Sequence, residues 1–380
     1  MESGLDGSCI VEFNNPTGED KMHILMCGPI ANTGGVSTHT TNLIKLLIKN
    51  GLFVSGFNLS GLSLESGEQT TVIKLYQRTI GLFIQIIRKR NSIDIVHIQA
   101  SGGIFAFIPA IVGSLTSRIL KKPNIITFHY SQTANFVKKY KEIFRFALKC
   151  CDKLILVSPG QERVIIDYFP QYRSKVTVIG NGYNPDVYYP LNKVKCRSEL
   201  GIPLDKYVLF NISNLTPTKG HKYLIKACSQ LQMERDDFLC YIAGRGEMKE
   251  ELLQQIKRSQ SEKKIKLIGY LKEEDVKKWI SASDLFVFPS LAESFGIVII
   301  EALACGLPVI ATINGGSESI VINENIGFLC PRENSNCLKE KIVKGLEKKW
   351  DRSIILNTAK TYTWNNIATK TKDIYKSFLN

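Results

Sequence analysis

Short apolar runs alternate with helical patterns along this 380-residue chain, and this alternation limits the possible folds more than any other feature. Apolar runs of strand length occur at 23–27, 55–59, 93–98, 124–128, 153–158 and 176–179. Helical patterns lie between them, for example at 37–49, 78–90 and 135–150. Such alternation is typical of parallel sheets covered by helices on both faces. We therefore predict an α/β protein.

A second series of the same kind follows a linker-like stretch at 182–206, which is rich in Pro, Tyr, Asn and charged residues. Its strand candidates are 207–212, 239–243, 265–268, 285–289, 308–311 and 327–329. We predict a flexible N-terminal extension (1–20), two domains (21–190 and 191–363) and a closing helix (364–380). Two doubly wound domains are expected to face each other across a cleft, with ligands at the carboxyl ends of their strands.

Bulk composition argues against several classes of protein. No apolar run approaches the roughly 18–20 residues of a membrane-spanning helix, and residues 1–20 lack the features of a signal peptide. The ten cysteines are scattered without zinc-ligand spacing, so we expect buried thiols in a reducing cytoplasm. The net charge of +14 is spread evenly over both halves, which argues against a nucleic-acid-binding arm. We expect a cytoplasmic protein, with the inner face of the cell membrane as a candidate location.

One segment, 284–308, carries most of the chemistry. A buried strand ends near Pro289, a polar loop follows, and a helix begins near Ser294 and ends at Gly306. We predict Ser294 as the N-cap and Gly306 as the C-cap of that helix. The backbone N–H groups of the turn, together with the positive end of the helix dipole, would bind a diphosphate. The candidate donor-binding residues of this turn are Ser294, Phe295, Gly296 and Ile297.

Two glutamates in this segment, Glu293 and Glu301, are eight positions apart, at most about 12 Å along a helix axis. Carboxylates accept hydrogen bonds from hydroxyl groups. Glu293 at the helix entrance would therefore contact a transferred sugar, and Glu301 the diol of a ribose. The alternative is that Glu293 belongs to an ordinary loop and Glu301 to a solvated helix face. The apolar residues around Glu301 argue against a solvated face.

The run from Glu293 to Glu301, continued by Ala-Leu-Ala-Cys-Gly-Leu-Pro-Val-Ile-Ala, resembles the signature of the retaining GT-B glycosyltransferases of family GT4. The resemblance extends from about residue 22 to residue 379. Further landmarks follow in the family's order: Gly34-Gly35-Val36, Asp94-Ile-Val-His97, Thr127-Phe-His129, Val157-Ser158, Asn181-Gly182, Lys219-Gly220, Gly244-x-Gly246, Ile268-Gly269-Tyr270 and Asn314-Gly315-Gly316-Ser-Glu318.

The resemblance implies two Rossmann-like domains of the GT-B fold, with the nucleotide-sugar donor held mainly by the second and the acceptor by the first. It also implies transfer with retention of anomeric configuration, no required cofactor and no obligatory metal. The absence of an Asp-x-Asp motif agrees with a metal-free reaction. In this family the closing helix crosses back to the first domain, so we expect the same of 364–379.

Lys219 lies in a loop between a predicted strand and a predicted helix, where its charge would neutralise the departing diphosphate. The alternative is an exposed loop lysine. The family usually has Arg five residues earlier, at the position of Asn214 here, so one phosphate-binding cation is missing. We hypothesise that Arg245, between two glycines at a strand end, supplies part of that charge. The alternative for Arg245 is a surface arginine.

The resemblance assigns roles to several other positions. His129 matches the active-site histidine that hydrogen-bonds the sugar, although a lone histidine is more often structural, and His97 is as well explained by packing. Gly34 and Gly35 would let the backbone approach the diphosphate or acceptor, or simply form a turn. Tyr270 would stack on the base or belong to the plain surface. Glu318 would fix the loop beneath the donor sugar, or else only begin a helix.

The stretch 135–150 combines an apolar face with five basic side chains. Basic amphipathic helices bind anionic lipid, so this stretch is a candidate membrane contact, and Arg88-Lys89-Arg90 is another. The alternative is a helix packed on its own domain with a solvated basic face.

Together these features predict a retaining glycosyltransferase that moves a sugar from a UDP- or GDP-linked donor to a glycan or lipid-linked acceptor, in surface polysaccharide or glycoconjugate synthesis. His129, Glu293 and Lys219 are the candidate catalytic residues. A nucleotide-sugar epimerase or hydrolase on the same scaffold is one alternative, and it would convert labelled donor without an acceptor. A non-catalytic basic binding module is the other, and its binding to polyanions would depend strongly on salt.

Overall fold

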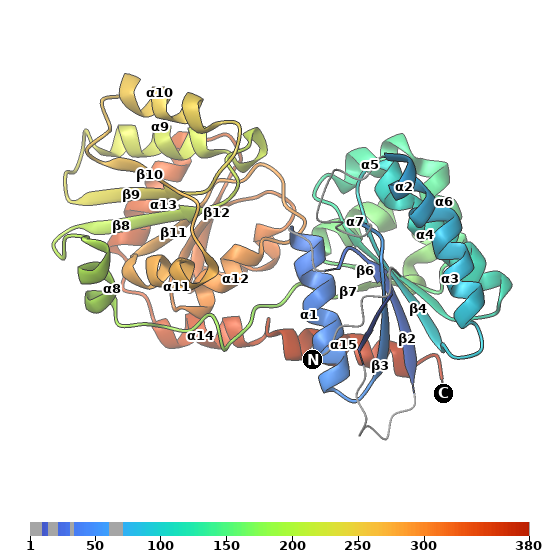
Figure 1. Ribbon diagram of the computed structural model, residues 1–380. Helices are drawn as coiled ribbons and strands as arrows, with labels where there is room; N and C mark the ends of the chain where they lie inside the picture. The colour runs from blue at the N-terminus through green and yellow to red at the C-terminus, as the bar shows by residue number, and fades with distance from the viewer. Residues whose placement is uncertain (1–9, 14–21, 31–33, 61–70, 380) are drawn as a thin grey trace. The chain divides into compact units, whose positions relative to one another are not determined.

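The structure is a computed structural model, and it describes residues 10–13, 22–30, 34–60 and 71–379. The chain forms two compact units (Figure 1). The first contains the chain up to Gly182 together with the segment from Trp364 onward, and the second contains Tyr183–Thr363. Each is an α/β unit built on a largely or wholly parallel sheet. Among the helices of the described ranges, none has both the length and the hydropathy needed to cross a membrane.

The first unit has a seven-stranded sheet in the order β1-β3-β2-β4-β5-β6-β7, in which only β1 is antiparallel to its neighbour. The strands are β1 (Ile10–Phe13), β2 (His23–Gly28), β3 (Phe53–Asn58), β4 (Ile95–Ser101), β5 (Asn124–His129), β6 (Lys153–Leu156) and β7 (Val176–Val178). The helices are α1 (Gly35–Lys49), α2 (Thr71–Tyr76), the π-helical turn η1 (Gln77–Gly81), α3 (Leu82–Lys89), α4 (Ile104–Ile119), α5 (Thr133–Lys139), α6 (Lys141–Cys150), α7 (Pro159–Tyr168), the 3₁₀ turn η2 (Pro170–Lys175) and α15 (Trp364–Lys376).

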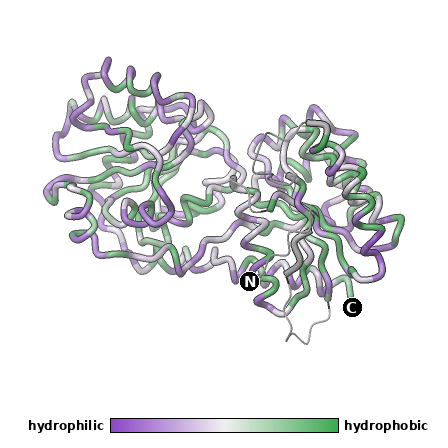
Figure 2. The backbone as a smooth tube through the Cα atoms, viewed as in Figure 1, coloured by the Kyte–Doolittle hydropathy of each residue, from purple (hydrophilic) through white to green (hydrophobic). Residues whose placement is uncertain are grey.

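Helices cover both faces of this sheet (Figure 1). On one face, α1 and α15 pack on the strands through Leu43, Leu47, Trp364 and Tyr375. On the other face, α3, α4 and α6 enclose a second core that contains stacked aromatic rings. Figure 2 shows hydrophobic stretches along the central strands and hydrophilic stretches mainly on the outer helices and loops. The alternation of apolar runs thus reflects strands buried on both faces.

The second unit has a six-stranded parallel sheet in the order β10-β9-β8-β11-β12-β13. The strands are β8 (Tyr207–Ile212), β9 (Phe238–Ala243), β10 (Ile265–Gly269), β11 (Leu285–Phe288), β12 (Val309–Thr312) and β13 (Gly327–Cys330). The helices are α8 (Lys193–Leu200), η3 (Pro217–Lys219), α9 (His221–Leu231), α10 (Lys249–Arg258), α11 (Glu273–Ala282), α12 (Ile297–Ala304), η4 (Ser317–Ser319), α13 (Ser335–Glu347) and α14 (Arg352–Lys360). This strand order is typical of dinucleotide-binding sheets. All strands are parallel, but β9 and β10 are added on one side of β8, and β11, β12 and β13 on the other, so the order of addition reverses between β8 and β11.

The units divide at Gly182 and Tyr183, not at the predicted 190/191 boundary. The backbone explains the difference, because Tyr183 forms a bridge with Thr363 and its N–H donates to the carbonyl of Tyr362 at 2.9 Å. Tyr188, which the prediction placed in the first domain, is buried in the second unit. The predicted linker also contains a helix, α8, which Asn192 caps by accepting from the N–H of Lys195 at 3.0 Å.

Two further expectations need correction. The predicted flexible extension 1–20 contains strand β1, because the backbone of Ile10–Phe13 pairs with the otherwise open edge of β3. The rest of that extension lies outside the described residues. The predicted helix 135–150 is two helices, α5 and α6, that meet at Tyr140. Its apolar residues Phe136 and Phe144 are buried in the core of the first unit, so that face is not available to a membrane.

Candidate active site

The loops that follow β8 and β11 hold the candidate donor site of the second unit. These strands are neighbours, and the strand order reverses between them, so their carboxyl ends border the place where such sheets bind ligands. Lys219 follows β8, and Glu293 follows β11. The Lys219 Nζ atom lies 2.5 Å from Oε1 of Glu293, and both side chains are mostly buried. Two residues predicted separately, 74 positions apart, thus form one ion pair.

Neighbouring groups hold this pair in place. The hydroxyl of Ser290 donates to Oε1 of Glu293 at 2.8 Å, and the N–H of Glu293 donates to the carbonyl of Asn314 at 3.1 Å. Gly220 has a φ of +67°, and a Cβ there would lie 2.1 Å from the carbonyl oxygen of Pro289. Only glycine therefore lets the Lys219 loop approach the end of β11 so closely.

The loop after β12 supports the glutamate segment from a third strand. The carboxylate of Glu318 accepts hydrogen bonds from the backbone N–H groups of Asn314 and Gly315 at 3.0–3.1 Å. A Cβ at Gly316 would lie 2.6 Å from the carbonyl oxygen of Phe295. Glu318 thus does fix a loop, and that loop packs directly against the predicted diphosphate-binding turn.

The helix entrance differs from the prediction. Helix α12 begins at Ile297, its N-cap is Gly296 with a φ of 103°, and no side chain caps it. Ser294 is therefore not the N-cap, because the left-handed backbone at Gly296 forms the cap position instead. In this loop, the backbone N–H of Leu291 donates to the carbonyl of Thr218 at 2.7 Å, and that of Glu293 to the carbonyl of Asn314 at 3.1 Å. At the other end, Gly306 follows the C-cap Cys305 with a φ of +77°, a conformation that favours glycine.

Glu301 is partly exposed on α12, and burial of its carboxyl raises its pKa to about 8, with the nearby charge of Glu273 adding to the rise. A hydrogen bond from the Tyr188 hydroxyl acts in the opposite direction. The same environment raises the pKa of Tyr188. Tyr188 was not among the predicted site residues, because it lies 113 positions before Glu301 in a stretch that resembles a linker.

Arg245 and Tyr270 also come together. The Arg245 guanidinium lies 5.0 Å from the centre of the exposed Tyr270 ring. The backbone of Arg245 contacts the Lys219 loop, since its carbonyl accepts from the N–H of Leu215 at 2.9 Å. A Cβ at Gly244 would lie 1.9 Å from the carbonyl oxygen of Ser213, so this close approach requires glycine. Arg245 therefore lies next to the loop in which exposed Asn214 replaces the expected arginine.

The remaining predicted residues belong to the first unit. Gly34 is the N-cap of α1 with a φ of 116°, and Gly35 is the first residue of that helix. His129 ends β5 and is only 8% exposed. Its Nε2 lies 2.8 Å from Oε1 of Gln99. Because an amide oxygen only accepts, His129 Nε2 carries the proton. Burial lowers the pKa of His129 well below its usual value, helped by His39 and His97, so its Nδ1 is an unprotonated acceptor.

Gln99 extends this arrangement to a second histidine. Its Nε2 lies 3.2 Å from Nε2 of His97, which also accepts from the hydroxyl of Thr127 at 2.7 Å. His97 therefore carries its proton on Nδ1, which donates to the Tyr375 hydroxyl on α15 at 2.6 Å. Burial lowers the pKa of His97 to about 3. His97 is thus a buried structural residue, and Gln99, which no motif singled out, connects it to His129.

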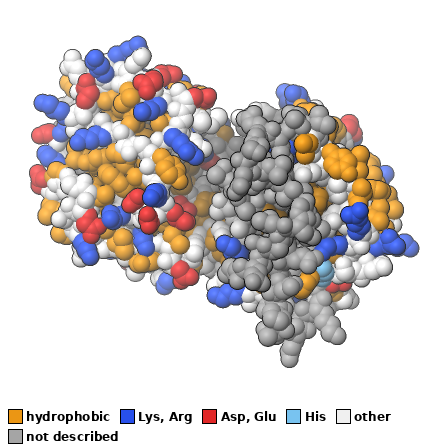
Figure 3. All heavy atoms as spheres, in the orientation of Figure 1, with side chains coloured by type: hydrophobic (Ala, Val, Ile, Leu, Met, Phe, Trp, Pro, Cys, Tyr) orange, Lys and Arg blue, Asp and Glu red, His pale blue; other side chains and the backbone are white. Residues whose placement is uncertain are grey.

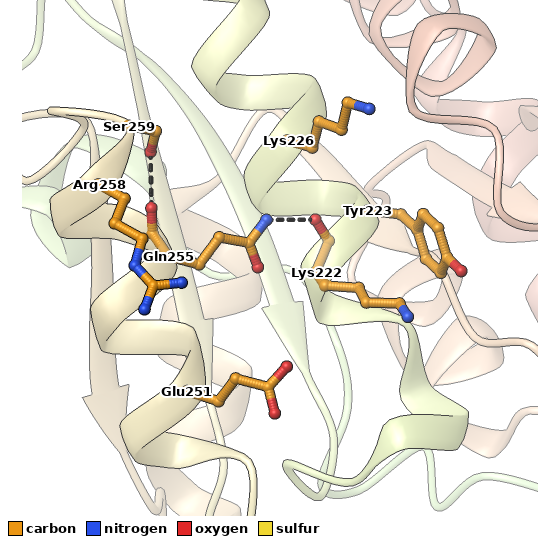
Figure 4. Close-up of a pocket in the computed structure, with 7 residues that line it drawn as sticks. All are labelled: Lys222, Tyr223, Lys226, Glu251, Gln255, Arg258 and Ser259. Carbon is orange, nitrogen blue, oxygen red and sulfur yellow. Dashed lines mark hydrogen bonds between the residues drawn. The ribbon is translucent and has the colours of Figure 1, made fainter.

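One pocket of about 480 Å³ lies apart from these residues. Lys222, Tyr223 and Lys226 of α9 line one side of it, and Glu251, Gln255 and Arg258 of α10 line the other, with Ser259 at the end (Figure 4). Gln255 Nε2 donates to the carbonyl of Lys222 at 2.9 Å. The pocket contains none of the predicted site residues, and its charged side chains are exposed. We assign it no role. Within the described ranges, no group of three or more His, Cys, Asp or Glu residues could hold a metal ion.

Comparison with known proteins matches both halves of the chain. A family model described as "Glycosyl transferases group 1" matches residues 192–361, and one described as "Glycosyltransferase Family 4" matches residues 33–187. An uncharacterized glycosyltransferase of Methanocaldococcus jannaschii is 26% identical over 90% of this chain and 94% of its own length. The Escherichia coli UDP-Gal:alpha-D-GlcNAc-diphosphoundecaprenol alpha-1,3-galactosyltransferase is 28% identical over 63% of each chain.

Solved structures share the fold. Sucrose-phosphate synthase from Thermosynechococcus elongatus superposes with a TM-score of 0.75 at 19% identity, over 94% of this chain and 99% of its own. HepE of Anabaena, solved in complex with UDP, has a TM-score of 0.75 at 21% identity, over 94% of this chain and 100% of its own. At these identities the likeness concerns the fold, which is GT-B with two Rossmann-like units.

Proposed function

Because this chain belongs to the group 1 glycosyltransferases of family GT4, we propose that it transfers a sugar from a UDP- or GDP-linked donor to a glycan or lipid-linked acceptor, with retention of anomeric configuration. The transfer would serve surface polysaccharide or glycoconjugate synthesis. Two relatives support the choice of substrates. HepE has been solved with UDP-glucose, and the Escherichia coli relative is named for a UDP-Gal donor and a diphosphoundecaprenol acceptor.

The ion pair of Lys219 and Glu293 at the β8–β11 switch point carries this proposal. A mostly buried lysine that already balances a carboxylate can turn toward a second anion at little desolvation cost. When the donor binds, the Lys219 ammonium neutralises the diphosphate, which also lies on the amides of Ser294–Ile297 at the start of α12. Glu293 then accepts from the hydroxyls of the sugar, and Glu301 from the ribose diol.

The proposed reaction uses these contacts. The bond between the sugar's anomeric carbon and the diphosphate oxygen breaks, and a bond to the acceptor oxygen forms on the same face. The acceptor's proton passes to the departing phosphate. Lys219 and the helix N-terminus stabilise the negative charge that develops there, so no metal is required. Neutral His129 accepts a hydrogen bond from the sugar through Nδ1 and adds no charge of its own.

A panel of UDP-, GDP- and ADP-sugars, screened by thermal stabilisation with and without EDTA, tests the donor. We expect one UDP- or GDP-sugar to raise the melting temperature equally in both conditions. The product made with that donor and a lipid-linked acceptor should retain the anomeric configuration of the donor, as read by NMR coupling constants. Indifference to every sugar nucleotide, loss of stabilisation with EDTA, or an inverted product would contradict the corresponding part of the proposal.

A further inference from the structure

A buried histidine lies behind the loop that carries Lys219. His221 is the first residue of α9 and is only 2% exposed. Its Nε2 atom lies 2.9 Å from the hydroxyl oxygen of Ser213, the residue that follows β8. Its Nδ1 atom has no hydrogen-bond partner among the described residues. Neither side chain takes part in the contacts with the donor proposed above, although both belong to the connection between β8 and α9.

The unpartnered Nδ1 atom decides which way this hydrogen bond runs. His221 is neutral at ordinary pH, because burial lowers its pKa to about 4, helped by the nearby charge of Lys219. A neutral imidazole carries a single proton, on one of its two nitrogens. In folded proteins a buried N–H without an acceptor is rarer than a buried acceptor without a donor. The proton of His221 is therefore on Nε2, and this N–H donates to the oxygen of Ser213.

The Ser213 hydroxyl then has its own proton left to donate. A hydroxyl has one O–H donor and two acceptor lone pairs, and the N–H of His221 occupies one lone pair. Among the described residues, no other group forms a hydrogen bond with this hydroxyl. Ser213 is partly exposed, so a ligand can reach it. Because hydrogen bonds in a chain polarise one another, the bond from His221 makes the hydroxyl a better donor.

The backbone holds Ser213 in one place at the end of β8. Its N–H donates to the carbonyl of Ala243 at 3.1 Å, and its own carbonyl lies so close to Gly244 that no larger residue fits there. The carboxyl end of β8 borders the point where the strand order reverses, which is where sheets of this kind bind ligands. Ser213 thus lies at the same edge of the sheet as the loop of Lys219.

This connection offers little positive charge to a diphosphate. Lys219 is the one lysine or arginine in 213–220, and it already pairs with Glu293. Position 214 is the neutral Asn214. Figure 3 shows lysine and arginine side chains interspersed with aspartate and glutamate over the visible face of the second unit, without a continuous basic area. Binding of a diphosphate therefore depends on individual hydrogen-bond donors.

We propose that the Ser213 hydroxyl donates a hydrogen bond to the diphosphate of the bound sugar nucleotide, and that His221 is the positioning residue behind it. A phosphate oxygen is the fitting acceptor, because a hydrogen bond to a charged acceptor is about twice as strong as one between neutral groups. The inference rests on the proposed function, since it concerns the same donor and the same site. The alternative is that the bond between His221 and Ser213 only holds the loop in place.

The variant Ser213→Ala removes the proposed bond with little change in volume. Isothermal titration calorimetry with UDP and GDP should show a loss of affinity of about tenfold or more for whichever of them the wild type binds. The affinity for the corresponding nucleoside, which has no phosphate, should stay unchanged. Ser213→Thr keeps a hydroxyl and should retain most of the affinity. Ser229→Ala is the matched control, because Ser229 lies on α9 and its hydroxyl donates to the carbonyl of Ile225 at 2.8 Å.

Two variants of His221 test its role. His221→Phe keeps the ring but removes the N–H, and it should weaken binding of the nucleoside diphosphate by about threefold. His221→Gln keeps an N–H at a similar reach and should restore that binding. In Ser213→Ala the change His221→Phe should cause no further loss, because the histidine acts only through the serine. NMR of the ligand-free protein with ¹⁵N-labelled histidine should show His221 protonated on Nε2.

Three outcomes would overturn the proposal: wild-type affinity for the nucleoside diphosphate in Ser213→Ala, an equal loss of affinity for the nucleoside, or His221 protonated on Nδ1. The first of these, combined with a lower melting temperature, would show that the bond only holds the loop. Circular dichroism verifies that each variant is folded. A wild type that binds neither UDP nor GDP would contradict the proposed function as well, whereas a wild type that binds one of them and an equally active Ser213→Ala would contradict this inference alone.

Discussion

The Nζ atom of Lys219 lies 2.5 Å from the Oε1 atom of Glu293, joining the loops that follow two adjacent parallel strands. The loop after β8 supplies the positive charge of Lys219, and the loop after β11 supplies the negative charge of Glu293. The pair forms because the strand order of the second unit reverses between β8 and β11.

Replacing Lys219 by alanine should lower kcat by about 100- to 1,000-fold, because one charge that stabilises the departing diphosphate is lost. Lys219→Arg should retain part of the activity. The matched control is Lys264→Ala, since Lys264 also pairs with a carboxylate, that of exposed Asp236, at 2.7 Å. Steady-state kinetics measure the effect. Equal losses for Lys219→Ala and Lys264→Ala would contradict a specific role of Lys219.

Replacing Arg245 by alanine should raise the KM for the donor, since Arg245 is the candidate substitute for the cation missing at Asn214. The double variant Arg245→Ala/Asn214→Arg should recover donor affinity, because it places a cation where the family usually has one. Tyr270→Ala serves as a comparison, because it removes the ring that lies 5.0 Å from the Arg245 guanidinium. Unchanged donor affinity and turnover in Arg245→Ala, with activity lost in Lys219→Ala, would show that Arg245 has no such role.

Glu301 should make the ligand-free protein less stable as pH rises toward about 8. Its pKa is higher in the folded than in the unfolded protein, so the folded state binds the proton more tightly between these two values. Stability from this group is therefore present at low pH and is lost as pH passes through about 8. Glu301→Gln should remove this trend, and melting temperatures from pH 5 to 9 measure it.

Two variants serve as controls for that pH dependence. Glu273→Gln should lower the pKa of Glu301 by removing a negative charge, and Tyr188→Phe should raise it by removing a hydrogen bond to the ionised form. Parallel melting curves for the wild type and Glu301→Gln across the whole pH range would refute the assignment.

Replacing Gln99 by leucine should release His129 from a single tautomer. In the wild type, NMR of ¹⁵N-labelled histidine should show His129 protonated on Nε2 and His97 on Nδ1. In Gln99→Leu the His129 signals should shift toward a mixture, and kcat/KM should fall by about tenfold or more. The control is Gln85→Leu, because Gln85 is also buried in the first unit and its Nε2 has no hydrogen-bond partner among the described residues. A wild-type His129 spectrum in Gln99→Leu would show that Gln99 does not fix the tautomer of His129.

Sequence patterns were sufficient for the fold class and for selecting Lys219 and Glu293, which the structure brings together. The strands at 207–212 and 124–128 were predicted nearly to the residue, because each is a buried apolar run bounded by polar turns. The exceptions are informative. The N-cap of α12 is Gly296 and not Ser294. Gly296 adopts a left-handed backbone conformation that places the start of the helix two residues later than the serine. The break at Tyr140 was missed because helical periodicity continues across it.

The sequence by itself determined most of the strands and helices. It also determined roughly where the two series divide, and that two glutamates lie eight residues apart near a helix start. These are local properties, since periodicity records which side of an element is buried. Only the tertiary structure decided that Lys219 pairs with Glu293, that Tyr188 bonds to Glu301, and that His97 meets Tyr375 across 278 positions. Which buried polar atoms meet depends on strand order and register, and distant segments settle both when they pack together.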